Sequence, residues 1–174
     1  MKHFKIGKFK PRPRFLPDDV YSYVRDSIVR GCVEALIMDK GQTKVLLGKR
    51  IIDPWPNWWT FGSRMVAGED PRDAVSRTVK EDLNLNIPAK RFIFLDVVSL
   101  VFPRRQEPPK ENGCHDLSLF YFLTISGAEN SLIRMRKQEY GKTRWFDPED
   151  VTKKAGFHLA TVECLKLALK IKKG

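Results

Sequence analysis

Acidic side chains gather in one short segment of this otherwise basic chain. Glu81 and Asp82 are adjacent, and Arg77 precedes Glu81 by four residues. At about 100° per residue, a helix would place these three side chains in one sector, together with Thr78. Glu69 stands shortly before this segment. The spacing therefore predicts a cluster of three carboxylates around one arginine.

Three carboxylates held together repel one another, and one arginine cannot neutralise all of them. A hard divalent cation would do so, because Mg²⁺, with Mn²⁺ as a second choice, takes carboxylate oxygens and completes its shell with water and substrate phosphates. Gly62 and Gly68 let the preceding backbone turn sharply, which could aim the Gly62 carbonyl at the same ion. The predicted metal ligands are Gly62, Glu69, Glu81 and Asp82. The alternative is a solvated helix face with an ordinary ion pair, which would contribute only ~0.3–0.5 kcal/mol.

Local signals place this cluster on a helix. Asp70 can cap the first turn, and Pro71 suits the first helical position, where its missing N–H leaves no hydrogen bond unmade. Asn84 tolerates the left-handed conformation in which helices often end. The segment 71–83 is therefore predicted to be helical, with a core-facing side formed by Val75, Val79 and Leu83.

Apolar runs elsewhere in the chain predict strands. The runs span residues 32–38, 43–50, 91–102 and 117–126, with a short fifth run at 143–146. Asp39-Lys40-Gly41-Gln42 joins the first two runs and predicts a hairpin turn. The third and fourth runs are rich in β-branched and aromatic residues and predict buried strands. The prolines of residues 51–59 predict a loop without regular structure.

Two more helices are predicted toward the ends of the chain. The first is capped by Asp18 and Asp19, runs to about Arg30, and has an apolar side formed by Val20, Tyr23, Val24 and Ile28. The second begins near His158, with Leu159, Val162, Leu165 and Leu169 on one side. Mixed strands with two or three helices predict an α+β or α/β sandwich, in which a mixed β-sheet lies between helices.

The length of 174 residues suits one folded domain, predicted over residues 18–174, behind a basic arm over residues 1–17. The formal net charge is +11. Much of it lies near the two ends of the chain, on Lys2, Lys5, Lys8, Lys10, Arg12, Arg14, Lys166, Lys170, Lys172 and Lys173. Basic ends favour contact with a polyanion such as RNA, and a solubilising tail is the alternative.

The three cysteines are too few and too scattered for a disulfide framework or a CxxC metal site. No apolar run approaches the ~20 residues that span a membrane. These features predict a cytoplasmic protein without a membrane partner.

The order of residues between positions 62 and 85 resembles the Nudix box. Ser63 stands at the second glycine of the opening Gly-Gly pair, Glu69 follows after five residues, and Arg77 after seven more. The positions that then fall on the pattern are Val79, Glu81, Asp82 and Leu85. Segments outside the box are also similar to the family: Trp59, Arg64, LLGKR, and Glu139 with TRWF. The resemblance covers most of the chain and implies a Nudix-type sandwich and an Mg²⁺-dependent hydrolase.

The departures from the box bear on mechanism. Thr78 replaces the glutamate after the box arginine, which in many members helps to bind metal and can act as base. A hydroxyl cannot replace a carboxylate in either role. Ser63 replaces a glycine, Phe61 the common proline, and Asn84 the final glycine. The resemblance therefore implies that the base is moved elsewhere or lost.

Within the family, the chain most resembles the GDP-mannose mannosyl hydrolase branch, which also lacks the glutamate after the box arginine. That resemblance implies cleavage at the sugar carbon with a histidine as base, and a homodimer. The branch's histidine lies inside the strand matched by LSLFYFLTI, which contains none. His115 is the nearest candidate, at the loop edge, and Glu139 is the competing base.

The remaining roles follow from side-chain chemistry. Arg77 would orient the carboxylates, and Arg50 and Arg64 could bind phosphate oxygens through their planar forks. Trp58 is the candidate to stack on a base or sugar. The predicted function is an Mg²⁺-dependent hydrolase of a nucleoside diphosphate derivative, such as a GDP-mannose-like nucleotide sugar. The alternatives are an enzyme acting on the capped or triphosphorylated 5′ end of RNA, and a Nudix-fold binding module without catalysis.

Overall fold

The computed structural model of the chain describes residues 1–10, 16–136 and 138–171. Its helices are α1 (Asp18–Ser27), α2 (Pro71–Leu83), α3 (Gly127–Ser131), α4 (Pro148–Lys153) and α5 (Leu159–Leu169), with 3-10 turns η1 (Ala89–Arg91) and η2 (Lys110–Asn112). Its strands are β1 (Arg30–Asp39), β2 (Val45–Arg50), β3 (Trp58–Trp59), β4 (Phe61–Arg64), β5 (Ile93–Phe102), β6 (Cys114–Ile125) and β7 (Tyr140–Phe146). None of the described helices is long and apolar enough to span a bilayer.

The strands form one mixed sheet in the order β3-β2-β1-β6-β5, with β4 paired to β1 and β7 to β2. β1 is parallel to β6, and its other neighbours, β2 and β4, are antiparallel. β1 is therefore the central strand, and its run from Cys32 to Met38 is buried throughout. The register places Glu34 of this strand between Gly62 of β4 and Phe120 of β6.

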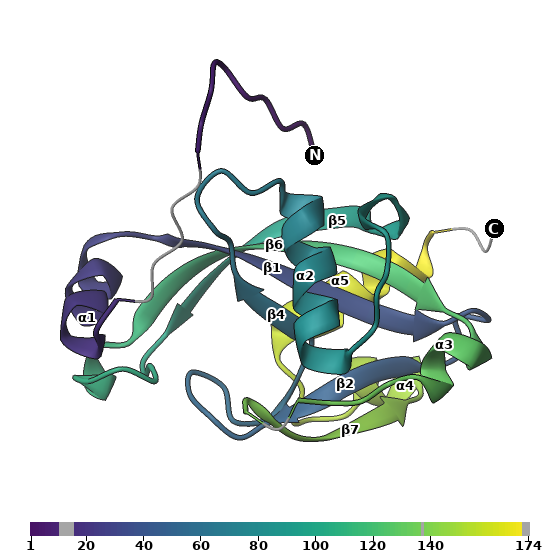
Figure 1. Cartoon of the computed structure of the whole chain (residues 1–174). Coiled ribbons are helices and arrows are strands. Elements are labelled where there is room, and N and C mark those ends of the chain that lie inside the picture. Colours follow the sequence, from purple (N-terminus) through teal and green to yellow (C-terminus); the bar gives the residue numbers. More distant parts are fainter. Residues whose placement is uncertain (11–15, 137, 172–174) are drawn as a thin grey trace.

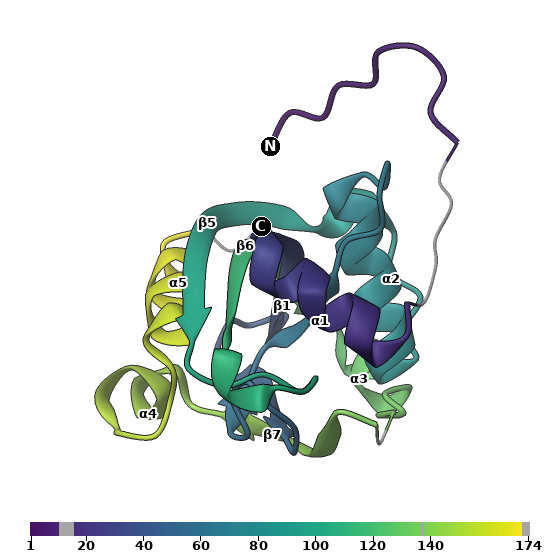
Figure 2. The same cartoon turned by 90° about the vertical axis from the view of Figure 1, so that its left-hand side faces the viewer.

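Helices cover both faces of the sheet. α2 lies on one face and α5 on the other, as the two views in Figures 1 and 2 agree. Val33, Val79 and Leu119 belong to the core on the α2 side, whereas Leu36, Phe120 and Leu165 belong to the core on the α5 side. The prediction of a mixed sheet between helices is confirmed.

The limits of α2 agree with the local signals. The Asp70 side chain accepts a hydrogen bond from the backbone N–H of Arg72, and Pro71 occupies the first turn. Asn84 ends the helix in the left-handed region, with φ 58°. The hairpin between β1 and β2 is also confirmed, because Asp39 accepts hydrogen bonds from the backbone N–H groups of Thr43 and Lys44 and so closes the turn.

The helices at the two ends differ from the prediction. α1 begins after Pro17, and neither Asp18 nor Asp19 caps it. α1 turns Ser22 and Arg25 toward the protein, because the loop after β5 offers them polar partners. The residues Val20, Tyr23 and Ile28 of the expected apolar side are exposed.

α5 is also rotated from the predicted orientation. Leu159 and Leu169 are exposed, whereas Thr161, Cys164 and Ala168 are buried with Leu165. The small side chains of the buried group let the helix approach the sheet closely. Of the four residues of the predicted side, Val162 and Leu165 are buried, so counting large apolar residues alone gave only half of that side correctly.

Two strand predictions also need correction. β5 is an edge strand rather than a buried one, and Ile93, Val97 and Val101 are exposed. The segment 51–59, predicted to be a loop, ends in the two-residue strand β3 paired with β2. The division into an arm over residues 1–17 and a domain over residues 18–174 stays a prediction. Residues 11–15 and 172–174 lie outside the described residues, and with them the basic residues Arg12, Arg14, Lys172 and Lys173.

Candidate active site

A cleft of about 540 Å³ opens between β4, the first turn of α1 and the segments that follow β2 and β5. Figure 1 shows α1 and the loop after β5 at the same end of the sheet. Charged side chains of both signs line this cleft: Arg30, Glu34, Arg50, Arg64, Arg77, Glu81, Glu107, Asp116 and Glu139. They come from elements far apart in the sequence, and the sheet register brings them together.

Arg77 is the centre of the predicted carboxylate cluster. Its Nε and Nη2 donate to the two carboxylate oxygens of Glu69, at 2.8 and 2.9 Å, and its Nη1 donates to Glu81 at 3.0 Å. The hydrogen bonds to Glu69 raise the pKa of Arg77. Burial would raise the pKa of Glu69, but the hydrogen bonds from Arg77 and from the backbone N–H of Val66 outweigh it and lower that pKa.

This pairing changes the role expected of Glu69. Both of its oxygens already accept hydrogen bonds from Arg77, and one also accepts from Val66. The structure therefore shows Glu69 as the residue that orients Arg77, and its place among the metal ligands stays a prediction.

Thr78 and Ser63 form a buried hydroxyl pair. Thr78 is fully buried against β4, so it does not share the polar face predicted for it. Its Oγ1 donates to the backbone carbonyl of Ala74 and lies 2.6 Å from Ser63 Oγ. Either hydroxyl can be the donor in that contact, since Ser63 Oγ also has an acceptor in the Arg64 carbonyl. The two departures from the Nudix box thus pack against each other.

Glu34 is a site residue that the sequence analysis missed. Its carboxylate accepts hydrogen bonds from Trp59 Nε1 at 3.0 Å and from Thr60 Oγ1 at 2.6 Å. Burial raises its pKa to about 7, although the Thr60 hydrogen bond, the nearby Arg50 charge and the Trp59 hydrogen bond each lower it. A single acid inside the otherwise apolar run CVEALIM was the available signal, since carboxylates are rarely fully buried without a role.

Gly62 accommodates Glu34. Gly62 was expected to supply a sharp turn, but it lies in β4 opposite Glu34. A Cβ added at position 62 would come within 2.2 Å of the Glu34 carboxylate carbon. The glycine is therefore needed for space, whereas Gly68, with φ 80°, does supply a turn.

We expect Gly62→Ala to displace the Glu34 carboxylate and to destabilise the fold by about 1–3 kcal/mol, because the added methyl group overpacks the site. Urea unfolding measures the loss. Gly127→Ala is the control, since a Cβ there meets no atom within 4 Å. Equal stability of the two variants would contradict this account of Gly62.

Asp82 is partly buried and lies among other acids. Its Oδ2 has no hydrogen-bond partner among the described residues. Burial and the charges of Glu139, Glu34 and Glu81 together raise the pKa of Asp82 to about 7, against a smaller lowering by Arg50. Asp82 does not itself line the cleft, although its neighbour Glu81 does.

Arg50 and Glu139 pair at the edge of the cleft. Arg50 Nη2 donates to Glu139 at 3.2 Å, while Arg50 Nε is buried without a partner among the described residues. The pairing leaves Glu139 about half exposed at its side chain. Arg64 also lines the cleft, and its guanidinium lies 5.6 Å from the Tyr21 ring centroid.

Two predicted site residues lie elsewhere. Trp58 packs edge-on against Phe146 at 4.8 Å and does not line the cleft, whereas its neighbour Trp59 does. His115 is not at a loop edge but within β6, where it hydrogen-bonds Ser99. Side chains alternate along a strand, so Asp116 faces the cleft and His115 faces the opposite side of the sheet. His115 is therefore not placed to act as the base of this cleft.

The donor set fits a hard divalent cation. Among the described residues, no three His, Cys, Asp or Glu side chains already form a preformed metal centre. However, the unbonded Asp82 Oδ2 and the mutual repulsion of Asp82, Glu81 and Glu139 are what an oxygen-bound cation would relieve. The residues that remain available to it are Glu81, Asp82 and the Gly62 carbonyl.

Comparisons with known proteins agree with this architecture. The structure resembles the MutT NUDIX hydrolase of Burkholderia pseudomallei, with 23% identity, coverage of 81% of this chain and 98% of that chain, and a TM-score of 0.64. It also resembles the NUDIX domain of Shewanella oneidensis NrtR in complex with ADP ribose, with 17% identity, coverage of 89% and 100%, and a TM-score of 0.60. A C. elegans Ap4A hydrolase matches with 17% identity, coverage of 79% and 93%, and a TM-score of 0.58.

A search of curated proteins found no match. The model of the NUDIX domain family, in contrast, matches residues 30–165, which include the cleft-lining strands, α2 and most of α5 but exclude α1. The match spans well over half of the sequence, and the fold and the Arg77 cluster agree with it. The chain therefore belongs to the NUDIX domain family.

Proposed function

We propose that the protein is a divalent-metal-dependent hydrolase of a nucleoside diphosphate-linked sugar. The observation that carries the proposal is the buried, unbonded Asp82 Oδ2 among like-charged acids, beside a cleft lined by arginines. Acids that repel one another attract a cation, and arginines attract phosphate. A metal-bound diphosphate brings both of these charges.

The family match supports a hydrolase acting on nucleoside diphosphate-linked substrates, and Nudix hydrolases generally use divalent metals such as Mg²⁺. In our proposal Glu81, Asp82 and the Gly62 carbonyl hold Mg²⁺, with Mn²⁺ as a substitute. When bound, the ion would polarise a phosphoryl oxygen and stabilise the charge of the leaving phosphate. Arg77 keeps Glu81 in place, because Glu69 fixes the Arg77 guanidinium in a bidentate pair.

Arg50 and Arg64 bind the phosphate oxygens in this proposal. Both line the cleft, and a guanidinium can form two charged hydrogen bonds to one phosphate. The pair with Glu139 uses only Nη2 of Arg50, so binding a phosphate through another N–H group would leave that pair intact.

Glu139 is the proposed general base. It lines the cleft and is solvent-accessible, so a water molecule can reach its carboxylate, whereas His115 lies on the other side of the sheet. Glu34 is the second candidate, because burial brings its pKa to about 7, where a general base works best. Trp59 and Thr60 occupy only one oxygen of Glu34, Oε2, and leave Oε1 for a proton.

The sugar part of the substrate is the finer step of the proposal. The similar structures include one with ADP ribose and one that is an Ap4A hydrolase, so nucleotide-derived compounds occur among the similar proteins. GDP-mannose stays one member of the class. The position of His115 removes the histidine on which a GDP-mannose-type attack at the sugar carbon would depend.

The experiment is turnover of a panel of nucleoside diphosphate sugars and dinucleotides with Mg²⁺ in ¹⁸O-water, read by mass spectrometry. Label on a phosphate product means attack at phosphorus, and label on the free sugar means attack at carbon. Turnover that persists in EDTA, or no turnover of any compound, would contradict the proposal.

We expect Glu139→Gln to lower kcat by about 10²–10⁴-fold, as is typical for the loss of a general base. Glu149→Gln is the matched control, because Glu149 is an exposed acid of α4 that pairs with Lys153 and does not line the cleft. If Glu139→Gln leaves kcat unchanged and Glu34→Gln lowers it, the base is Glu34.

The two alternatives have distinct outcomes. A 5′-end RNA substrate, suggested by the basic ends, would show binding that weakens steeply with salt. A binding module would bind nucleotides without turnover. The binding module is tested with the double variant Ser63→Gly/Thr78→Glu. Thr78→Glu alone would bury the new carboxylate against the Ala74 carbonyl, so both substitutions are made together. Activity created only in this double variant would favour the binding module.

A further inference from the structure

The cleft continues past the acidic cluster to α1, beyond the segment that matches the family. Tyr21, Arg30, Glu107 and Asp116 line this far end. Asp116 is not open to a ligand there, because both of its oxygens accept hydrogen bonds from Arg30, at 2.9 and 2.7 Å. Glu107 and Tyr21 are different, because each keeps a polar atom unused.

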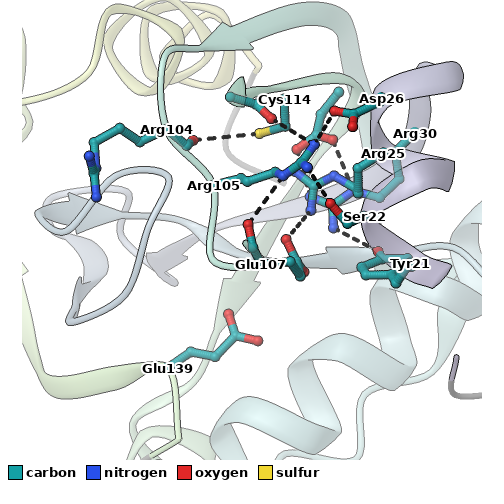
Figure 3. A network of polar contacts seen from close by, with 12 residues as sticks. Tyr21, Ser22, Arg25, Asp26, Arg30, Arg104, Arg105, Glu107, Cys114 and Glu139 are labelled. Atoms are coloured by element: carbon teal, nitrogen blue, oxygen red, sulfur yellow. Dashed lines mark hydrogen bonds and ion pairs between the residues drawn. The ribbon is translucent and has the colours of Figure 1, made fainter. Parts of the chain in front are cut away.

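Buried arginines hold Glu107 in place. Arg25 Nη1 donates to Glu107 Oε2 at 3.1 Å, and the Arg25 side chain is only 4% exposed. Arg105, which is fully buried, donates to the Glu107 carbonyl at 3.2 Å, to Asp26 at 2.5 Å and to Ser22. Figure 3 shows these side chains of α1 and of the loop meeting, with Glu139 well apart from them. Such a network orders a surface loop around one carboxylate.

The unused atoms are a donor and an acceptor. Glu107 Oε1 has no hydrogen bond among the described residues, since the Arg25 bond uses Oε2. The Tyr21 hydroxyl accepts from Arg30 Nη1 at 3.2 Å, and its own proton remains available to donate. A ligand hydroxyl both donates and accepts, so neighbouring hydroxyls of a sugar ring match this pair.

Other ligand groups fit less well. A phosphate would be repelled by Glu107, and the arginines Arg50, Arg64 and Arg77 suit it better. A guanine edge would donate two N–H groups to both oxygens of one carboxylate, whereas Oε1 is the one oxygen of Glu107 without a hydrogen bond from the described residues. The ligand group that fits Glu107 and Tyr21 best is therefore an uncharged group with several hydroxyls.

We propose that Glu107 and Tyr21 form a hydroxyl-binding subsite, which selects substrates by the sugar attached to the diphosphate. The subsite rests on the proposed hydrolase function, since it shares the cleft with Arg77 and Glu81. α1 and the loop after β5 are then the elements of this chain that determine substrate choice.

The test crosses two variants with two sets of analogues. The variants are Glu107→Gln, which keeps an acceptor for Arg25, and Tyr21→Phe, which removes only the hydroxyl. The analogues are monodeoxy versions of the sugar beyond the diphosphate, and 2′- and 3′-deoxy versions of the nucleoside. Glu111→Gln is the control, because Glu111 is an exposed acid of the same loop that does not line the cleft.

The wild-type protein should lose about 10- to 100-fold in kcat/KM when the contacted hydroxyl is removed from the sugar, because a buried polar group is then left unpaired. In Glu107→Gln and Tyr21→Phe the intact substrate should itself react about tenfold more slowly, and the deoxy analogue should add little further loss. If instead the nucleoside deoxy analogues react more slowly, the ribose of the nucleoside, and not the sugar beyond the diphosphate, occupies the subsite.

The outcomes also separate the subsite from the hydrolase. The subsite alone is overturned if removal of the sugar hydroxyl lowers kcat/KM equally in the wild type, Glu107→Gln and Tyr21→Phe. The same holds if the variants change the preferred base but not the sensitivity to removal of the hydroxyl. If the wild type turns over nothing, calorimetric titration with the intact and deoxy nucleotide sugars applies the same comparison to binding. Binding without turnover that depends on Glu107 contradicts the hydrolase and keeps the subsite. Absence of both turnover and binding overturns both.

Discussion

Replacing Asp82 by asparagine is expected to lower kcat by about 10²–10³-fold and, at the same time, to raise the melting temperature at pH 8. The loss of activity follows from the proposed role of Asp82 as a metal ligand. The gain in stability follows from its environment, because burial and the charges of Glu139, Glu34 and Glu81 make the ionised carboxylate unfavourable. An amide has no such charge to bury.

The pH dependence of stability gives the sign of this effect. The pKa of Asp82 is about 7 in the folded protein and near the ordinary 3.8 in the unfolded chain. Between these values the folded state retains a proton that the unfolded state has lost, so stability falls as pH rises through this window. Asp82→Asn should flatten the decline, although Glu34, whose pKa is also raised to about 7, leaves part of it.

The measurement is urea unfolding of both proteins at pH 5 and pH 8 without metal, with kcat measured at saturating Mg²⁺. Asp73→Asn is the control, since Asp73 is an exposed acid of the first turn of the same helix. A variant that is less stable than the wild type at pH 8 would show that the Asp82 charge is compensated. Unchanged kcat would remove Asp82 from the proposed metal site.

Replacing Arg77 by methionine is expected to destabilise the protein by about 2–3 kcal/mol at neutral pH and to abolish most of the activity. Arg77 donates three charged hydrogen bonds, two to Glu69 and one to Glu81, and a fourth bond to the Arg64 carbonyl. Glu69 is largely buried, with 15% of its side chain exposed, so removing its partner leaves a desolvated charge. Arg77→Lys should restore only part of the loss, because an ammonium group lacks the planar fork.

Acidification provides a check on this mechanism. The pKa of Glu69 is lowered in the folded protein, so the pair contributes its stability above the ordinary value of 4.5 and loses it as pH falls through the folded pKa. The difference between the wild type and Arg77→Met should therefore shrink in acid. Arg72→Met, on the exposed side of α2, should be close to neutral. A difference that persists unchanged at low pH would assign the loss to packing and not to the Glu69 pair.

The sequence by itself determined the elements that depend on near neighbours. Asp70, Pro71 and Asn84 act within a turn of the α2 ends, and Asp39 closes a hairpin through residues four and five positions away. The i,i+4 pair of Arg77 and Glu81 is likewise a property of one helix. These interactions need no knowledge of the sheet, so the limits of α2 and the pairing of Arg77 with Glu81 were predictable.

Only the tertiary structure decided which residues share the cleft. Glu34 reaches the site because β1 pairs with β4 and faces Gly62, an arrangement that joins residues far apart in the sequence. Thr78 is buried because Ser63 of β4 lies opposite it. Trp58 does not line the cleft but its neighbour Trp59 does, since adjacent strand residues point to opposite faces.

The same physical reason governs α1 and β6. Whether α1 turns its apolar or its polar side inward depends on Arg105 and Glu107, about 80 residues away along the chain. Whether His115 or Asp116 faces the cleft depends on a register in which a shift of one residue exchanges the two faces of the strand. Interactions between near neighbours in the sequence do not decide either orientation, because the partners that decide it are brought together only by the folded sheet.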